Sequence, residues 1–370
     1  MTMGTSRVRG PIVVTGGGTA GHVLPAIAVL EGLVEQGCAV GDLLYIGAQR
    51  GVETRLLPMT PFRHEFLNVV GVQRRFSRST ITYGVKLFAA TLRTVGWFRR
   101  QRPSVIVSVG GYASMPAVIA AKVVRRPIVV VSYDRIPGRA SRLAARWAVA
   151  SAVAFDDSGL PNARHVGAPL RQAVLKIDRI ADASQARERL GVPPNRFLVV
   201  VVGGSLGSGV LNDAVQQLLR DRREDTELAI FHVTGARDVW TPDSLVDEHG
   251  VWYRRAEFVD DVANLYAAAD LLVGRGGAST VHEVAATGTP AVLVPWSGAA
   301  DDHQRENVRW LAEVGAAVTV DDGDINGILA AIEQLRATPE RRSAVSTSAR
   351  ARGEIHHRGG LASLVLSIGS

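Results

Sequence analysis

Short apolar segments alternate along this chain with longer segments of mixed polarity. The apolar segments are rich in valine, isoleucine and leucine, which predicts strands that are buried on both faces. Helices are expected between them, and strands that alternate with helices indicate parallel sheets built from right-handed βαβ units. We predict strands at residues 12–15, 43–47, 105–109, 128–132 and 152–155, and again at 197–202, 228–233, 271–274, 291–294 and 316–320.

The pattern divides the chain into two halves. Each half opens with an apolar strand and a glycine-rich turn, at 16–21 and at 203–208, and prolines interrupt the alternation within 166–196. The fold class is therefore α/β, with two Rossmann-like, doubly wound domains that face each other across a cleft. The predicted divisions are an N-terminal domain of residues 1–166, a C-terminal domain of residues 167–345, and a helix over 346–370 that packs back on the N-terminal domain.

Composition narrows the class of protein. The 370 residues are enough for two domains, and the single cysteine, Cys38, excludes an internal disulfide. The uncharged stretch 103–121 contains Gly110, Gly111 and Pro116, which favours strand, turn and helix over a membrane span. The first residues lack the pattern of a secretory signal.

Positive charge is concentrated in one part of the first half. The net charge is +7, and no acidic residue lies between Glu65 and Asp134, where eleven basic residues occur. Apolar side chains such as Phe88 and Trp97 are interleaved with them. A basic, aromatic-containing helix is typical of contact with an anionic membrane surface. Nucleic acid is the competing partner, and a solvated helix with its apolar side on the core is the structural alternative.

Residues 271–307 predict a ligand site. An apolar strand runs into glycines and then into a helix that carries Glu283, and a second strand ends in a polar loop at 301–307. Free N–H groups and the helix dipole attract anions at such strand ends, and a carboxylate on the helix can hold ribose hydroxyls. The stretch therefore indicates a sugar-nucleotide site. The alternative for Glu283 is a T-x-x-E capping box that begins at Thr280.

A second candidate site follows the first strand. Residues 16–21 match G-x-G-x-x-G, but no acid for a dinucleotide ribose follows the second strand at Ala48, so a diphosphate is favoured over a nicotinamide cofactor. His22 follows in the first helical turn, where the positive helix end disfavours imidazolium. It is a candidate general base for a sugar hydroxyl, or alternatively a histidine that only packs at the turn.

Two further loops have weaker signals. Gly110-Gly111-Tyr112 follows a strand and either holds a second anionic group or is an ordinary turn. Ser205 either donates to a phosphate or is the N-cap of a helix. The acidic doublets have no convincing companion ligands for a metal, and helix N-termini can stabilise a departing diphosphate instead.

These motifs together resemble the MurG family, the N-acetylglucosaminyltransferases of bacterial peptidoglycan synthesis. Gly17–Val23 is similar to the family motif G-G-T-x-G-H, and the loops at 110–112, 203–207, 258–261 and 275–283 follow in the same order. The resemblance implies a GT-B fold and an inverting, metal-independent transfer from UDP-N-acetylglucosamine to the muramoyl 4-hydroxyl of lipid I, which gives lipid II. It implies no cofactor, no nucleic acid and a peripheral position on the cytoplasmic side of the cell membrane.

The resemblance also implies roles for individual residues. His22 is the proposed base. Val259 would meet the uracil, Glu283 the ribose and Ser205 a phosphate. The full sets are Thr19, Gly21, Arg171, Ser205, Val259, Ala278, Ser279, Glu283 and Gln304 for the donor, and Gly17, Gly18, Gly110, Gly111 and Tyr112 for the acceptor.

The chain departs from the family pattern at three places. Ser132–Arg135 stands where the family has H-E-Q-N, His303-Gln304 replaces paired glutamines, and Ala168 replaces an asparagine. These changes bear on the acceptor and the sugar more than on nucleotide binding. They leave two alternatives, which are transfer to another polyprenol-linked or secondary-metabolite acceptor, and a non-catalytic membrane scaffold.

Overall fold

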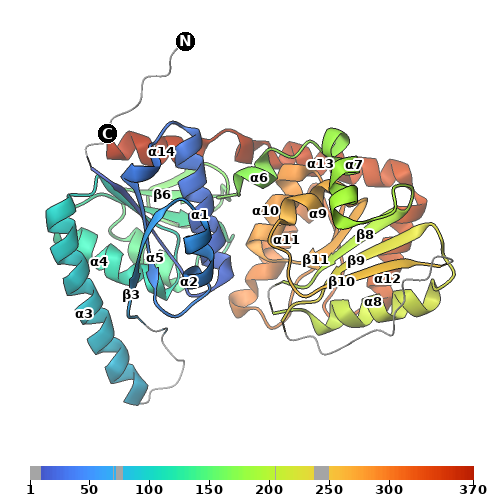
Figure 1. Cartoon of the computed structure of the whole chain (residues 1–370), viewed down its shortest axis with the longest axis horizontal. Coiled ribbons are helices and arrows are strands. Elements are labelled where there is room, and N and C mark those ends of the chain that lie inside the picture. The colour runs from blue at the N-terminus through green and yellow to red at the C-terminus, as the bar shows by residue number, and fades with distance from the viewer. Residues whose placement is uncertain (1–9, 70, 72–77, 205, 237–249) are drawn as a thin grey trace, which may run out of the picture. The chain divides into compact units, whose positions relative to one another are not determined.

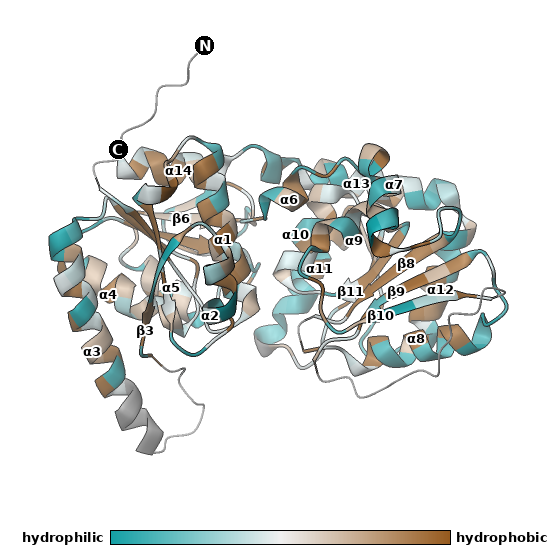
Figure 2. Ribbon diagram, in the orientation of Figure 1, coloured by the Kyte–Doolittle hydropathy of each residue, from teal (hydrophilic) through white to brown (hydrophobic). Residues whose placement is uncertain are grey.

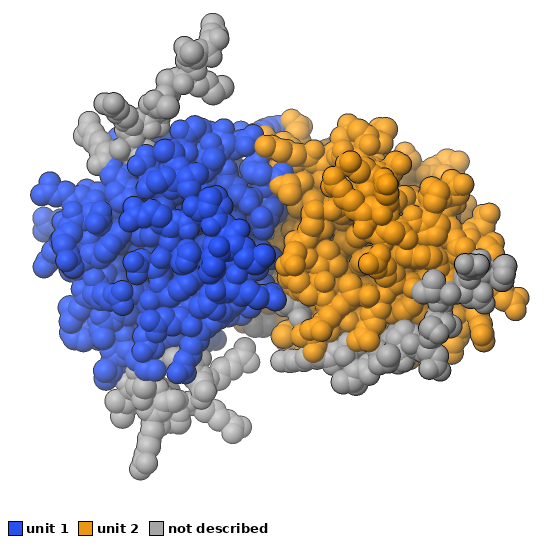
Figure 3. Space-filling view, in the orientation of Figure 1, with its two compact units in different colours: residues 1–172, 358–370 blue, residues 173–357 orange. Residues whose placement is uncertain are grey.

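The computed structural model describes residues 10–69, 71, 78–204, 206–236 and 250–370 (Figure 1). The chain forms two compact units (Figure 3). Unit 1 comprises Met1–Gln172 and Arg358–Ser370, and unit 2 comprises Ala173–His357. The sequence prediction had placed the first division between residues 166 and 167.

Unit 1 is built on a seven-stranded sheet in the order β3-β2-β1-β4-β5-β6-β7. Every neighbouring pair is parallel, as the βαβ pattern predicts. The strands are β1 (Ile12–Thr15), β2 (Leu43–Ala48), β3 (Arg63–Leu67), β4 (Val105–Ser108), β5 (Ile128–Ser132), β6 (Ala150–Val153) and β7 (Ala163–His165). The helices are α1 (Ala20–Glu35), α2 (Glu53–Leu56), α3 (Arg78–Gln101), α4 (Met115–Val123), α5 (Arg139–Ala145), α6 (Gln172–Leu175), which spans the division, and α14 (Gly360–Gly369).

Unit 2 repeats the plan with a six-stranded parallel sheet in the order β10-β9-β8-β11-β12-β13. The strands are β8 (Phe197–Val202), β9 (Leu228–Val233), β10 (Trp252–Ala256), β11 (Leu271–Arg275), β12 (Ala291–Val294) and β13 (Val318–Thr319). The helices are α7 (Arg179–Leu190), α8 (Gly209–Asp221), α9 (Val262–Ala268), α10 (Ala278–Thr287), α11 (His303–Ala312), α12 (Ile325–Ala337) and α13 (Pro339–His357).

Each sheet forms the hydrophobic interior of its own unit. The central strands β1, β4, β8 and β11 are buried almost throughout, which explains why they lack an alternation of apolar and polar residues. Figure 2 shows the strands as hydrophobic and the outer helices as mixed, and the apolar stripes of α4 and α8 pack against the sheets. Because the strands of each sheet are parallel, their carboxyl ends lie along one edge of that sheet.

Three strands, β3, β7 and β10, were not predicted from the sequence. All three are edge strands, and each carries charged or polar residues, such as Arg63 and Glu65 in β3 and Arg254 in β10. An edge strand is protected from pairing with other chains by such side chains, which also remove the apolar signal of a strand.

The C-terminal segment contains two helices in place of the single helix predicted over 346–370. Gly359, at φ +65°, separates α13 from α14 in a left-handed conformation that ends a helix. The helix α14 contacts α1 and β4 of unit 1. The Gln36 side chain fixes its start, because its Nε2 donates to the Gly359 carbonyl at 2.8 Å and its Oε1 accepts from Ser363 at 3.1 Å.

Candidate active site

Two glycine loops meet at the carboxyl edge of the unit 1 sheet. One follows β1 and the other follows β4, and these strands are neighbours. Gly111 has φ +78°, and a Cβ atom there would lie 2.4 Å from the Gly17 carbonyl oxygen. A Cβ atom on Gly18 would lie 2.4 Å from Cε1 of Tyr112. The structure thus brings together Gly17, Gly18, Gly110, Gly111 and Tyr112, for which the family resemblance implies contact with the acceptor.

A buried carboxylate supports the first glycine loop. Glu53 is fully buried and accepts hydrogen bonds from the N–H groups of Gly18 at 3.1 Å and Ala48 at 3.0 Å. The Tyr45 hydroxyl donates to the Gly16 carbonyl at 2.5 Å. Glu53 was not singled out in the sequence, because its distance from the loop is set by the fold and no local pattern marks it. The Gly18 N–H is thus already paired with the Glu53 carboxylate.

His22 lies in the first turn of α1 and faces the second glycine loop. Its Nδ1 is 3.1 Å from the Thr19 hydroxyl, and a Cβ atom on Gly110 would lie 3.5 Å from its Nε2. Burial lowers the pKa of His22 below its ordinary value of 6.5, against a smaller opposite effect of Asp134 and Glu53. The imidazole is accordingly neutral at pH 7.

A cavity of about 240 Å³ opens beside His22. The segment that departs from the family pattern lines it, with Ser132, Tyr133 and Asp134. The Tyr133 hydroxyl donates to the Gly21 carbonyl, and burial raises the pKa of Tyr133, so this group stays a neutral donor. Arg135, by contrast, forms an ion pair with Asp157 at 2.8 Å. Three of the four replaced residues therefore line the cavity beside the candidate base.

In unit 2 the helix α10 follows β11 and two glycines. The N-cap is Gly277 and the helix begins at Ala278, so Thr280 is inside the helix and the capping box considered for Glu283 does not form. Glu283 instead accepts a hydrogen bond from the Tyr266 hydroxyl at 2.7 Å, on its Oε2 atom. The capping alternative for Glu283 is wrong, because the helix starts earlier than that box requires.

The loop after β8 corrects a second alternative. Ser208 is the N-cap of α8, and its hydroxyl accepts from the Leu211 N–H at 3.3 Å. The proposed N-cap role of Ser205 is therefore wrong, since another serine fills that position. Ser205 itself lies outside the described residues, so its suggested phosphate contact stays a prediction.

The remaining donor residues of unit 2 lie in loops or first helical turns that follow β10, β11 and β12 at the carboxyl edge of the sheet. Val259 is in the loop between β10 and α9, and Ala278 and Ser279 open α10. Gln304, in the first turn of α11, accepts from the Trp296 N–H at 3.0 Å. A Cβ atom on Gly276 would lie 2.7 Å from the Gln304 carbonyl oxygen, so the starts of α10 and α11 are in contact.

Three of the predicted donor residues belong to unit 1. Thr19 and Gly21 flank the start of α1. Arg171, expected in the C-terminal domain, forms an ion pair with Glu31 of α1, with 2.8 Å between Nε and Oε1. Its guanidinium thus has a protein partner within unit 1.

The described residues contain neither a candidate metal site nor a membrane-spanning helix. No group of three or more His, Cys, Asp and Glu side chains in that part of the chain could hold a metal ion. None of the helices in the same residues is long and apolar enough to cross a membrane.

The sequence matches known proteins over nearly its whole length. Residues 12–153 match the N-terminal domain of glycosyltransferase family 28, and residues 198–358 match its C-terminal domain. A relative from a Nocardioides species is 34% identical over 342 residues, which cover 92% of this chain and 93% of that protein. One from Paenarthrobacter aurescens is 37% identical over 317 residues, with 85% and 84% covered.

Both relatives are named UDP-N-acetylglucosamine–N-acetylmuramyl-(pentapeptide) pyrophosphoryl-undecaprenol N-acetylglucosamine transferase. The crystal structure of Acinetobacter baumannii MurG superposes with a TM-score of 0.69 at 25% identity and covers 96% of this chain and 99% of its own. The predicted fold, two Rossmann-like units of the GT-B class, is confirmed. By matched domains, relatives and fold, the chain belongs to glycosyltransferase family 28.

Proposed function

We propose that the protein transfers N-acetylglucosamine from UDP-N-acetylglucosamine to the 4-hydroxyl of the muramoyl sugar of lipid I and so produces lipid II for peptidoglycan synthesis. The observation that carries this proposal is the similarity to relatives of that name, at 34% and 37% identity over most of both chains. The contacts of Glu283 in unit 2 and of His22 in unit 1 support it.

The donor is assigned to the carboxyl edge of the unit 2 sheet. Glu283 accepts hydrogen bonds from the ribose hydroxyls, and the Val259 backbone meets the uracil. Ala278, Ser279 and Gln304 lie at the starts of α10 and α11, where unpaired N–H groups and the helix dipole stabilise negative charge. These groups stabilise the diphosphate as it departs with the electron pair of the broken sugar–phosphate bond.

His22 is assigned as the general base. In the tautomer that carries its proton on Nδ1, that nitrogen donates to Thr19, and Nε2 is the acceptor. The acceptor 4-hydroxyl gives its proton to Nε2 while its oxygen forms the new bond to C1 of the sugar, on the face opposite to the departing UDP. This single displacement inverts the anomeric centre. The two glycine loops of unit 1 and Tyr112 hold the acceptor diphosphate next to His22.

A second candidate acceptor rests on the cavity beside His22. Ser132, Tyr133 and Asp134 line it in place of the family's usual residues. An acceptor that differs from lipid I near the reacting hydroxyl, on another polyprenol carrier, is the alternative that this observation favours.

Helix α3 supports a peripheral position on an anionic membrane surface, and the family resemblance implies the cytoplasmic side. Val85, Phe88 and Leu92 are 64%, 66% and 55% exposed and follow one face of the helix, whereas Val95 and Phe98 pack into the core. Lys86, Arg93, Arg99 and Arg100 flank the exposed apolar residues. This apolar and basic face, which we call the α3 face, fits an interface of headgroups and acyl chains.

The reaction is tested by incubating the purified protein with UDP-N-acetylglucosamine and a short-chain lipid I analogue, with and without EDTA. We expect glycosylated lipid and UDP in equal amounts, because no step of the proposed mechanism uses a cation. Donor binding without product would contradict lipid I as the acceptor and favour the second candidate. Loss of product on addition of EDTA would contradict a metal-independent transfer.

Replacement His22→Ala tests the base. Turnover should fall by about two to four orders of magnitude while UDP affinity is retained. Because the pKa of His22 is lowered, the neutral base predominates above that pKa, so wild-type kcat should fall only as the pH drops below about 6.5. The control His64→Ala alters a histidine of the edge strand β3 and should change neither. Near-normal turnover of His22→Ala would refute the assignment.

Replacement Glu283→Ala tests the donor site. Loss of hydrogen bonds to a charged group should weaken UDP binding by about 1–3 kcal/mol, measured by calorimetry. Glu313→Ala, which removes an exposed carboxylate paired with Arg309, is the matched control and should bind UDP normally. Equal affinities of Glu283→Ala and wild type would remove Glu283 from the site.

The double replacement Phe88→Ser and Leu92→Ser tests the α3 face. Partition onto vesicles of anionic lipid should weaken by about 2 kcal/mol or more, since two large side chains no longer leave water. Ile180→Ser, at a side chain that is 89% exposed in unit 2, is the control for general hydrophobicity. Partition that is unchanged in the double variant would show that the α3 face is an ordinary solvated surface.

A further inference from the structure

Tyr266 contacts Glu283, and the proposed mechanism does not use it. It belongs to α9, is 5% exposed, and its hydroxyl donates to Oε2 of Glu283 at 2.7 Å. The Thr280 hydroxyl, on the same side of α10 as Glu283, also bonds to the Tyr266 side chain. Burial and the Glu283 charge raise the pKa of Tyr266 well above 10, so the phenol remains a protonated donor at every pH of an assay.

A second set of hydrogen bonds joins the backbones of the same two residues. The Thr289 hydroxyl donates to the Tyr266 carbonyl at 3.1 Å, and the Thr287 hydroxyl donates to the Glu283 carbonyl at 2.8 Å. The Thr289 N–H donates to the Thr287 hydroxyl oxygen at 3.3 Å, which links these two hydrogen bonds at a buried site. Tyr266 and Glu283 are therefore connected through their side chains and, independently, through their backbones.

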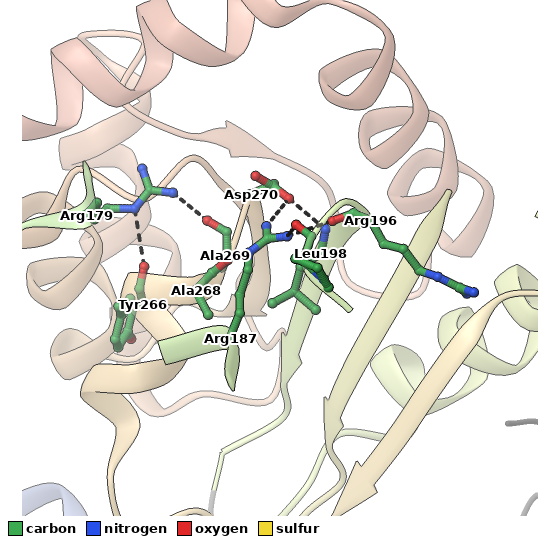
Figure 4. Close-up of polar contacts among 9 residues, drawn as sticks. Arg179, Arg187, Arg196, Leu198, Tyr266, Ala268, Ala269 and Asp270 are labelled. Carbon is green, nitrogen blue, oxygen red and sulfur yellow. Dashed lines mark hydrogen bonds and ion pairs between the residues drawn. The ribbon is translucent and has the colours of Figure 1, made fainter. Parts of the chain in front are cut away.

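Arg179 of α7 fixes the ends of both helices. Its Nε donates to the Tyr266 carbonyl at 3.2 Å, its NH2 to the Ala269 carbonyl, and its NH1 to the Gly288 carbonyl at 3.3 Å. Ala269 and Gly288 are the C-caps of α9 and α10. Figure 4 shows Arg179 directed at the end of α9. A cation that satisfies the last carbonyls of two helices holds them at a fixed separation.

This arrangement reduces the freedom of the Glu283 carboxylate. A glutamate on a helix surface has several rotamers, and immobilising such a side chain on binding costs affinity. The Tyr266 bond removes that freedom before a ligand arrives. A carboxylate offers about four acceptor positions on two oxygens, so it can accept from Tyr266 and from ribose hydroxyls at the same time.

We propose that Tyr266 is a positioning residue of the donor site, which holds the Glu283 carboxylate in the rotamer that accepts the ribose hydroxyls and so sets the preference for a ribonucleotide over a deoxyribonucleotide. The proposal rests on the proposed function, because it takes Glu283 as the ribose contact. It predicts that the loss of one hydroxyl on Tyr266 reproduces much of the effect of losing Glu283.

The test compares the affinities for UDP and for 2′-deoxy-UDP, measured by calorimetry on the full-length protein. The proteins are the wild type, Glu283→Ala, Tyr266→Phe and, as a matched control, Tyr253→Phe. Tyr253 is another buried tyrosine of unit 2, and its hydroxyl is 3.2 Å from Nδ1 of His232. A purely structural loss lowers both affinities and leaves their ratio unchanged, whereas a positioning loss lowers the ratio.

We expect the wild type and Tyr253→Phe to prefer UDP by about tenfold, the usual effect of one hydrogen bond to a charged group. Glu283→Ala should lower the ratio of the two affinities close to one, and Tyr266→Phe should lower it nearly as far. KM for the donor should rise in Tyr266→Phe with kcat little changed. A wild-type ratio in Tyr266→Phe, with the ratio lost in Glu283→Ala, would overturn the positioning role and leave the donor site intact.

Two further outcomes keep the two proposals separate. If the wild type does not prefer UDP, or Glu283→Ala keeps the preference, Glu283 does not contact the ribose, and both the donor assignment and the role of Tyr266 fail. If Tyr266→Phe does not fold, Thr289→Val takes its place, because it removes one of the bonds to the Tyr266 backbone at a fully buried site. That variant should lower the ratio partly, and an unchanged ratio would overturn the proposal.

Discussion

Parallel pairing of the strands is the constraint on which the rest of this structure depends. In an antiparallel sheet the loops alternate between the two edges, but in each of these sheets every described pair runs the same way. All loops that follow a strand therefore gather at one edge, together with the N-termini of the helices that come next. The candidate residues of each unit come from different parts of the sequence and meet at that edge for this reason.

The two units use this edge differently. In unit 1 the first glycine loop is bonded to the buried Glu53 and packs against Tyr112. The cavity of this edge lies beside His22. In unit 2 the corresponding edge carries Glu283 in a hydrogen-bonded pair with Tyr266, and the starts of α10 and α11 touch through Gly276. The first arrangement suits proton transfer beside a shaped cavity, and the second suits recognition of hydroxyls and anions.

The sequence predicted the central strands and glycine loops well, because burial on both faces and a turn between strand and helix leave local signals. It did not predict β3, β7 and β10, whose edge positions require polar side chains. Two helix N-caps were also predicted at the wrong residues. The N-caps are Gly277 and Ser208, not Thr280 and Ser205, because the position of an N-cap depends on the geometry of the preceding loop. Glu53, Tyr266 and Arg179 act through partners that are distant in sequence, so only the fold reveals them.

The proposed function depends on binding of the nucleotide at the carboxyl edge of the unit 2 sheet. Amide hydrogen exchange of the full-length protein, with and without saturating UDP, tests it most directly. UDP should slow exchange most strongly in residues 257–262 and 276–283, around Val259 and Glu283. Unchanged exchange in these two segments, with protection confined to the glycine loops at 16–22 and 110–114 of unit 1, would contradict it.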